Sequence, residues 1–277
     1  MILNLDSKFN PTTNQQTIDF ESFVFAGGEP HIKIKSDLTD LKSVIISTRI
    51  RSFNDIGMLL VAVDALRRAK VNNLELILPY FPGARQDRVA SSGEALTAKV
   101  YADLINAQNF DTVTIFDAHS DVSPALINNC VNLDNSDFIR TVIEDIDEEL
   151  TLIAPDSGAS KKIHHLAEKL AITDVIECSK SRNPDTRELS EFKVYADDLA
   201  GKPCLVVDDI CDGGRTFIGI AKALKKKNAG KIYLAVSHGI FSWGFDELNK
   251  YFEKIFCTDS FQTLEETNCL KQIPLTF

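Results

Sequence analysis

Short apolar runs rich in β-branched residues alternate with amphipathic stretches along most of the chain, and this alternation constrains its fold more than any other feature. Several runs are continuously apolar instead of alternating with polar residues, which is typical of strands covered on both faces. Such strands, joined by helices through right-handed crossovers, form a parallel sheet. We predict strands at residues 23–26, 43–49, 74–79, 112–116, 151–154, 174–176, 204–207, 231–236 and 255–258.

The stretches between these runs carry apolar side chains at helical spacing. In residues 52–70, Ile56, Leu59 and Val63 recur at intervals of three and four, which places them on one face of a helix. The pattern predicts an α/β protein with mainly parallel sheets flanked by helices. Further helices are predicted at residues 94–106, 136–146, 160–170, 216–227 and 245–252.

Length and charge limit the number of domains and the partners. For 277 residues we expect two domains, residues 1–142 and 143–277, divided near an acidic helical segment. The net charge is −10, and duplex nucleic acid requires a positive footprint, so no nucleic-acid partner is predicted. An acidic protein can bind a small phosphorylated ligand through backbone N–H groups, a few placed arginines or lysines, and divalent metal.

Cysteine usage and hydropathy bear on the compartment. None of the six cysteines forms a Cys-x-x-Cys pair, and most lie in apolar runs, so reduced buried thiols are predicted. No apolar stretch reaches the length of about 18 residues that a membrane-spanning helix needs. The N-terminal segment lacks the basic start and apolar core of a signal peptide. We therefore expect a cytoplasmic protein with no membrane partner.

The strongest motif is Cys-Leu-Val-Val-Asp-Asp-Ile-Cys-Asp-Gly-Gly-Arg-Thr at residues 204–216. It begins with the apolar strand predicted at 204–207 and continues past its end, and ligands of parallel sheets bind beyond the carboxyl ends of the strands. Gly213 and Gly214 let the backbone turn sharply and approach an anion. A helix that starts near Thr216 presents N–H groups to a phosphate. The motif therefore predicts a phosphate site.

Two acids in the same motif suit a sugar. Asp208 and Asp209 offer a fixed pair of acceptors for two hydroxyl groups. The alternative for the whole string is an ordinary strand-to-helix turn with an aspartate cap. The complete string resembles the phosphoribosyl-diphosphate (PRPP) loop of the type I phosphoribosyltransferase fold. Since that fold serves several enzymes, the loop alone does not define the reaction.

A second motif, Pro-Tyr-Phe-Pro-Gly-Ala-Arg-Gln-Asp-Arg at residues 79–88, also follows an apolar strand. Its two arginines flank Gln-Asp and can grip a triphosphate and a base edge. Taken alone, the segment could equally be a surface loop with compensating charges. Together with the flanking segments 63–69 and 96–99, it closely resembles ribose-phosphate pyrophosphokinase, the PRPP synthetase family.

Four shorter matches follow from that resemblance. Phe-Asp-Ala-His-Ser at 116–120 is similar to the family's Asp-Leu-His metal motif, and Pro-Asp-Ser-Gly at 155–158 to its Pro-Asp-x-Gly segment. Lys-Ser-Arg at 180–182 resembles its catalytic flexible loop. Phe-Ala-Gly-Gly-Glu at 25–29 resembles a segment that approaches ATP from a neighbouring subunit. Without the resemblance, a lone strand-end histidine would be structural, and the lysine and arginine would be solvated charges.

The resemblance implies two phosphoribosyltransferase-type domains with the active site between them. It implies Mg²⁺-dependent transfer of the β,γ-diphosphoryl group of ATP to the 1-hydroxyl of D-ribose 5-phosphate. The products are PRPP, for nucleotide and NAD biosynthesis, and AMP. It also implies a homodimer or a larger homo-oligomer.

The resemblance assigns roles residue by residue. The catalytic residues are Lys180 and Arg182, and the metal ligands are His119 and Asp156. ATP is expected to contact Phe25, Gly27, Gly28, Glu29, Arg85, Gln86 and Asp87. Ribose 5-phosphate is expected to contact Arg182, Asp208, Asp209, Asp212, Gly213, Gly214, Arg215 and Thr216.

Departures from the family pattern leave alternatives open. Gly27 and Ser181 replace an aspartate and an arginine, and Gly213 and Arg215 replace a threonine and a glycine. We expect Arg215 to compensate for the missing hydroxyl, the alternative being a side chain that faces solvent or pairs with an acid. A phosphoribosyltransferase that uses PRPP and a base remains the alternative enzyme, and a non-catalytic regulatory homologue the alternative class. We also expect the catalytic loop to be mobile without ligands.

Overall fold

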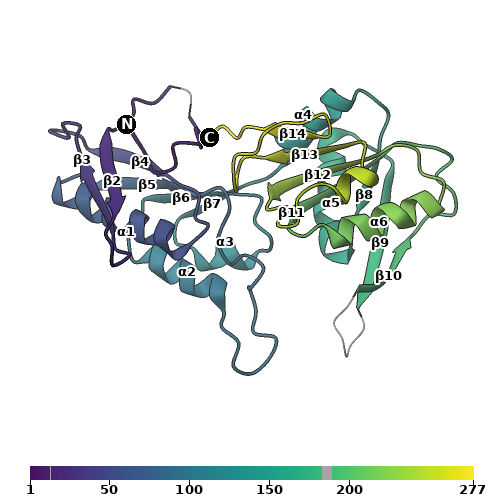
Figure 1. Ribbon diagram of the computed structural model, residues 1–277, viewed down its shortest axis with the longest axis horizontal. Helices are drawn as coiled ribbons and strands as arrows, with labels where there is room; N and C mark the ends of the chain where they lie inside the picture. Colours follow the sequence, from purple (N-terminus) through teal and green to yellow (C-terminus); the bar gives the residue numbers. More distant parts are fainter. Residues whose placement is uncertain (13, 183–188) are drawn as a thin grey trace. The chain divides into compact units, whose positions relative to one another are not determined.

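The computed structural model divides into two compact α/β units (Figure 1). The first unit consists of three segments, Met1–Asp134, Ser260–Thr263 and Pro274–Phe277, and the second of Asn135–Asp259 and Leu264–Ile273. The chain thus returns to the first unit twice near its C-terminal end. The structure describes residues 1–12, 14–182 and 189–277, with the backbone alone at 181–182 and 189–191.

A parallel five-stranded sheet forms the centre of the first unit, in the order β1-β4-β5-β6-β7. The apolar side chains of its central strands are almost all buried, as the apolar runs predicted. The carboxyl ends of all five strands therefore lie at one edge. The strands are β1 Ile2–Asn4, β4 Ser43–Ser47, β5 Asn73–Ile77, β6 Thr112–Phe116 and β7 Cys130–Leu133.

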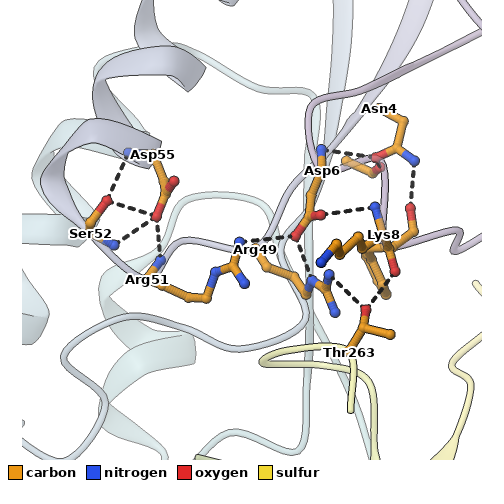
Figure 2. Close-up of polar contacts among 10 residues, drawn as sticks. Asn4, Asp6, Lys8, Arg49, Arg51, Ser52, Asp55 and Thr263 are labelled. Atoms are coloured by element: carbon orange, nitrogen blue, oxygen red, sulfur yellow. Dashed lines mark hydrogen bonds and ion pairs between the residues drawn. The ribbon is translucent and has the colours of Figure 1, made fainter. Parts of the chain in front are cut away.

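Three helices cover this sheet, and the longest shows how the sequence sets its start. In α1, Phe53–Arg68, the hydroxyl of Ser52 and the carboxylate of Asp55 cap each other's backbone N–H groups (Figure 2). A capping box of this kind contributes about 1 kcal/mol to the stability of the helix. The face that begins with Ile56 is buried, as its spacing predicted. The other helices are α2 Thr97–Asn106 and α3 Val122–Leu126.

Figure 2 also shows a buried arginine that ties two segments of the first unit together. The side chain of Arg49 is 1% exposed, and its Nε donates to Oδ2 of Asp6 at 2.7 Å. Its Nη2 donates to Oγ1 of Thr263 at 3.1 Å, and that hydroxyl donates to the Lys8 carbonyl at 2.7 Å. The guanidinium also lies 5.2 Å from the ring centroid of Phe9. Arg49 therefore joins the N-terminal loop to a returning C-terminal segment.

The second unit is built on seven strands in the order β10-β9-β8-β11-β12-β13-β14. All neighbours are parallel except β10, which pairs antiparallel with β9. Its helices are α4 Ser136–Ile146, α5 Ser157–Leu170 and α6 Arg215–Lys226. The strands are β8 Thr151–Ala154, β9 Val175–Arg182, β10 Leu189–Val194, β11 Cys204–Cys211, β12 Ile232–Gly239, β13 Lys254–Thr258 and β14 Leu270–Ile273.

The predicted α/β class is confirmed, whereas two predicted elements need correction. The helix predicted at residues 245–252 is wrong, because only the 3₁₀ turn Leu248–Lys250 forms there. Its apolar spacing reflects the burial of Leu248 and Phe252 in the core of the second unit. The strand predicted at residues 23–26 lies earlier, because the backbone turns after β2, Phe20–Val24.

Three further observations concern the boundary, the thiols and the membrane. Helix α4 belongs entirely to the second unit, whereas the predicted boundary after residue 142 falls inside it.

All six cysteines are free thiols, four of them buried. No helix within the described part of the chain has the length and apolar character to cross a bilayer.

Candidate active site

In the first unit, the segments that follow β5 and β6 meet at the carboxyl edge of the sheet. Oγ of Ser120 donates to Oδ2 of Asp87 at 2.6 Å. The N–H of Gln86 donates to the Gly83 carbonyl at 2.8 Å, which closes a turn that leaves Arg85 and Gln86 exposed. The predicted ATP segment and the predicted metal motif are therefore in direct contact, through a serine that the motif contains but that was given no role.

The backbone that carries His119 is fixed by β7. The N–H of Asp117 donates to the Leu133 carbonyl at 2.7 Å, and the N–H of Ala118 donates to Oδ1 of Asn132 at 3.1 Å. Asp117 itself is buried and has φ of +41°. These contacts hold the strand end so that His119 lies exposed at the edge of the sheet. Sequence reasoning missed Asn132, which lies in an edge strand that it did not predict.

The predicted ATP contact at residues 25–29 is the tip of a two-stranded hairpin, formed by β2 and β3, Pro30–Ile34. The N–H of Phe25 donates to the Glu29 carbonyl at 2.9 Å, and Gly28 has φ of +96°, where glycine is favoured. The Phe25 ring is 52% exposed. The tip, with Gly27, thus presents an apolar side chain and a carboxylate to the surface of the chain.

In the second unit, Asp156 joins a helix start to the predicted catalytic lysine. Its Oδ1 caps α5 by accepting from the N–H groups of Gly158 at 2.9 Å and Ala159 at 3.1 Å. Its Oδ2 pairs with Nζ of Lys180 at 2.5 Å. Burial alone would raise the pKa of Asp156, but the hydrogen bond and charge of Lys180 outweigh it and lower that pKa. The carboxylate is therefore ionised, with both oxygens engaged.

The paired acids of β11 lie within electrostatic reach of that ion pair. The N–H of Asp209 donates to Oδ1 of Asp208 at 2.9 Å. Burial raises the pKa of Asp208 well above its usual range, and the negative charges of Asp209 and Asp156 raise it further. Groups that donate hydrogen bonds or carry positive charge are therefore favoured here, as sugar hydroxyls or a cation would be.

The loop after β11 combines a strained turn with an open helix start. Gly214 has φ of +76°, where an L side chain is strained, and a Cβ added there would lie 3.0 Å from Cδ2 of Leu248, a tight contact, so glycine is favoured at this position. The N-cap residue of α6, Gly214, has no side chain that could cap the helix, which begins at Arg215 and continues with Thr216. A helix start of this kind suits an anion. Asp212, which the motif also contains, lies half-buried in the same turn.

One residue of this region was not anticipated. Trp243 is 60% exposed, and the guanidinium carbon of Arg215 lies 4.2 Å from the centroid of its ring system. A Cβ added to Gly213 would lie 3.1 Å from Cδ2 of the same ring. The available signal was the single tryptophan of the chain, placed just beyond the strand next to β11.

The remaining predicted residues are less closely defined. Arg182 ends β9 in register with Leu189, and its side chain lies outside the description. Residues 183–188, the centre of the loop expected to be mobile, also lie outside the described residues. His119 belongs to the first unit and Asp156 to the second, so neither unit by itself unites the two predicted metal ligands. No metal-binding group of three histidine, cysteine or acidic side chains occurs within the described residues.

Both units also match known domains. Residues 4–108 match the model of the N-terminal domain of ribose phosphate pyrophosphokinase, and residues 133–269 match that of the phosphoribosyl transferase domain. The crystal structure of phosphoribosylpyrophosphate synthetase from Mycobacterium smegmatis superposes with a TM-score of 0.79 and 23% identity, over 93% of this chain and 86% of that one. The fold and the site thus define a protein of phosphoribosyltransferase-type domains.

Sequence similarity over most of the chain identifies the family. The ribose-phosphate pyrophosphokinase of Thermosipho africanus is 32% identical over 255 residues, 87% of this chain and 78% of that protein. That of Mycoplasma pneumoniae is 32% identical over 236 residues, 84% of this chain and 70% of that protein. The chain belongs to the ribose-phosphate pyrophosphokinase family, and the resemblance inferred from its motifs is confirmed.

Proposed function

We propose that this protein transfers the β,γ-diphosphoryl group of ATP to the 1-hydroxyl of D-ribose 5-phosphate and forms PRPP and AMP. The observation that carries the proposal is the presence of two family segments in one chain. A phosphate loop with paired acids supports sugar-phosphate binding, and the pyrophosphokinase N-terminal domain supports an ATP site. A phosphoribosyltransferase that consumes PRPP would need only the second of these.

In the proposed reaction, the sugar 1-oxygen attacks the β-phosphorus in line. The new oxygen–phosphorus bond forms as the bond to the bridging oxygen breaks, AMP leaves with that oxygen, and the 1-hydroxyl proton passes to solvent. Transfers of this type require mainly positioning and neutralisation of charge. Lys180 and Arg182 are assigned the charge that develops on the transferred group.

The substrates divide between the two units. Asp208 and Asp209 would accept hydrogen bonds from the ribose hydroxyls, and the loop at residues 212–216 would hold the 5-phosphate. Arg85 and its neighbours Gln86 and Asp87 would hold ATP. The exposed tip with Phe25 and Glu29 would complete that site in a second copy of the chain, so we propose a homodimer or a larger assembly.

The donor set also fits Mg²⁺. Oδ2 of Asp156 already holds a cation, the ammonium of Lys180, and Asp208, whose pKa is raised first by burial and then by the charges of Asp209 and Asp156, would be stabilised as a carboxylate by a cation. Carboxylate oxygens are the ligands that Mg²⁺ takes in proteins. When bound, the ion would neutralise phosphate charge. We assign Asp156 and His119 to hold it, together with oxygens of the substrates.

A coupled assay for AMP tests the proposal. Purified protein receives ATP and Mg²⁺, with and without ribose 5-phosphate, in the absence of any nitrogenous base. We expect AMP only when ribose 5-phosphate is present, and no turnover in excess EDTA. Release of diphosphate from PRPP with a base would instead indicate a phosphoribosyltransferase, and no turnover of either kind a regulatory homologue. Full activity in EDTA would overturn the metal assignment.

A further inference from the structure

We propose that Trp243 is a positioning residue of the sugar-phosphate site, whose indole holds the guanidinium of Arg215 beside the phosphate loop. The loop would then recognise a phosphate monoester with a side-chain cation in addition to its backbone N–H groups. The inference rests on the proposed function, since it concerns the same ribose 5-phosphate site.

The geometry of the stack is the first support. The Arg215 guanidinium carbon lies 4.2 Å from the centroid of the Trp243 ring system, within the range of a cation–π contact. Arg215 is the first residue of α6, so the stack fixes its side chain at the helix end that attracts anions. An arginine held in one orientation has less conformational freedom to lose when it binds phosphate.

The glycine next to this arginine is the second support. A Cβ at Gly213 would lie 3.1 Å from Cδ2 and 3.3 Å from Cε2 of Trp243. The indole therefore lies directly on the loop, in the space that a larger residue at position 213 would take. The threonine of the family pattern at this position and the indole would compete for the same space. The chain thus has a stacked guanidinium where the family pattern has a hydroxyl.

The charge of the loop gives the physical need for a cation. Asp208, Asp209 and Asp212 place three carboxyl groups within five residues of sequence, and a phosphate monoester carries up to two negative charges. Backbone N–H groups alone supply only partial positive charge. A guanidinium makes charge-assisted hydrogen bonds to phosphate oxygens, which are stronger than those of a neutral hydroxyl.

The single tryptophan of the chain makes the stack directly observable, because emission excited beyond the absorption of the five tyrosines reports on Trp243 alone. We would titrate ribose 5-phosphate, ribose and inorganic phosphate into the wild type and into Arg215→Gly. Ribose 5-phosphate should change the emission saturably, inorganic phosphate should do so at higher concentration, and ribose should have no effect. In Arg215→Gly the midpoint for ribose 5-phosphate should rise at least fivefold. An unchanged midpoint would overturn the proposal.

Kinetic variants separate positioning from folding. In Trp243→Ala, KM for ribose 5-phosphate should rise three- to tenfold, while KM for ATP and kcat stay within twofold. Trp243→Phe keeps a ring and should recover at least half of the loss. Lys222→Ala is the matched control, since it removes another cation of α6 from an aromatic ring, that of Tyr251, and should leave both KM values unchanged.

The two proposals fail differently. If the wild type forms no AMP but its emission responds to ribose 5-phosphate through Arg215, the proposed function fails and the positioning role stands. If the wild type turns over and Trp243→Ala has a normal KM for ribose 5-phosphate, the positioning role alone is overturned. Equal rises in both KM values would also overturn it, because they would indicate a general disturbance of the fold.

Discussion

Asp6 in the first unit and Asp156 in the second each hold a cation at a partly dehydrated position, and the two pairs differ in how firmly the cation is fixed. Asp6 and Arg49 have side chains that are 11% and 1% exposed, whereas those of Asp156 and Lys180 are 22% and 25% exposed. Burial favours the neutral acid in both cases, yet the cation outweighs it and lowers each pKa. The two ion pairs thus have the same charges and the same kind of hydrogen bond, but the residues around them differ.

The surroundings of each cation indicate its role. Arg49 also bonds Thr263 (Figure 2) and lies against the Phe9 ring, so it has several partners that only the folded chain provides. Lys180 lies on β9, where it is in register with Phe192 of the antiparallel strand β10 (Figure 1). A flexible ammonium with an acid partner near a helix start can exchange that partner for a phosphate. We therefore expect the first pair to stabilise the fold and the second to serve catalysis.

The largest expected effect is on stability. Arg49→Met should lower the free energy of unfolding by about 3–5 kcal/mol, because it removes the nearer and fully buried cation of Asp6 and leaves the carboxylate with Arg51 alone, at 3.5 Å and 42% exposed. Denaturant unfolding measures the change. Arg68→Met, which breaks the exposed pair with Asp64, is the control and should cost less than about 1 kcal/mol. Similar losses in both variants would contradict the proposed role of burial.

The second effect is on turnover. Lys180→Ala should lower kcat by a factor of about 10²–10³, which corresponds to roughly 3–4 kcal/mol, by analogy with the loss of one preorganised donor to a transition state. KM for ATP should change little, because the charge is needed mainly when the phosphoryl group transfers. Steady-state kinetics separate the two parameters. A rise in KM with normal kcat would make Lys180 a ground-state ligand, and a loss of stability as large as that of Arg49→Met would remove the contrast.

The third effect is opposite in sign and concerns the acid beside the second pair. Because the pKa of Asp208 is raised in the folded state, that state binds more protons than the unfolded chain above about pH 4. Stability therefore falls as pH rises from there through the folded pKa. Asp208→Asn should increase the free energy of unfolding at pH 7 by about 1 kcal/mol and have little effect at pH 3.5. It should also weaken ribose 5-phosphate binding, measured by calorimetry.

The sequence predicted the parts of the fold that are buried on both faces. Continuous apolar runs located the central strands, and the run at 204–207 lies at the start of β11. The strands that were missed are β1, β7, β10 and β14, which form sheet edges, and β3 in the hairpin. Most edge strands expose one side and pair with a single neighbour, so their residues are mixed in polarity and do not form an apolar run. The strand β1 is mostly apolar and buried, but it has only three residues.

The candidate site was predictable wherever local geometry demands a particular residue. Gly214 is such a position, since its positive φ and its close approach to Leu248 both favour glycine. The pairing of Lys180 with Asp156 was not predictable, because it depends on two strands placed side by side by the sheet. The stack of Trp243 on Arg215 is a similar case, formed between loops 28 residues apart in the sequence. Tertiary contacts of this kind leave no local pattern.

The smallest expected effect is the acid response of the first pair. The folded pKa of Asp6 lies below its usual 3.8, so the ion pair stabilises the fold fully above that value, and this contribution is lost as pH falls through the folded pKa. Asp6→Asn should lower the free energy of unfolding by a constant amount at every pH. It should also abolish the pH-dependent loss of about 1 kcal/mol that titration of Asp6 causes in the wild type between pH 5 and pH 2. Melting curves over that range, with Asp64→Asn as the exposed control, measure it. If wild type and Asp6→Asn lost stability in parallel over this range, Asp6 would titrate alike in the folded and unfolded states. The buried arginine would then provide packing but no charge stabilisation, and the contrast between the two pairs would rest on Lys180 alone.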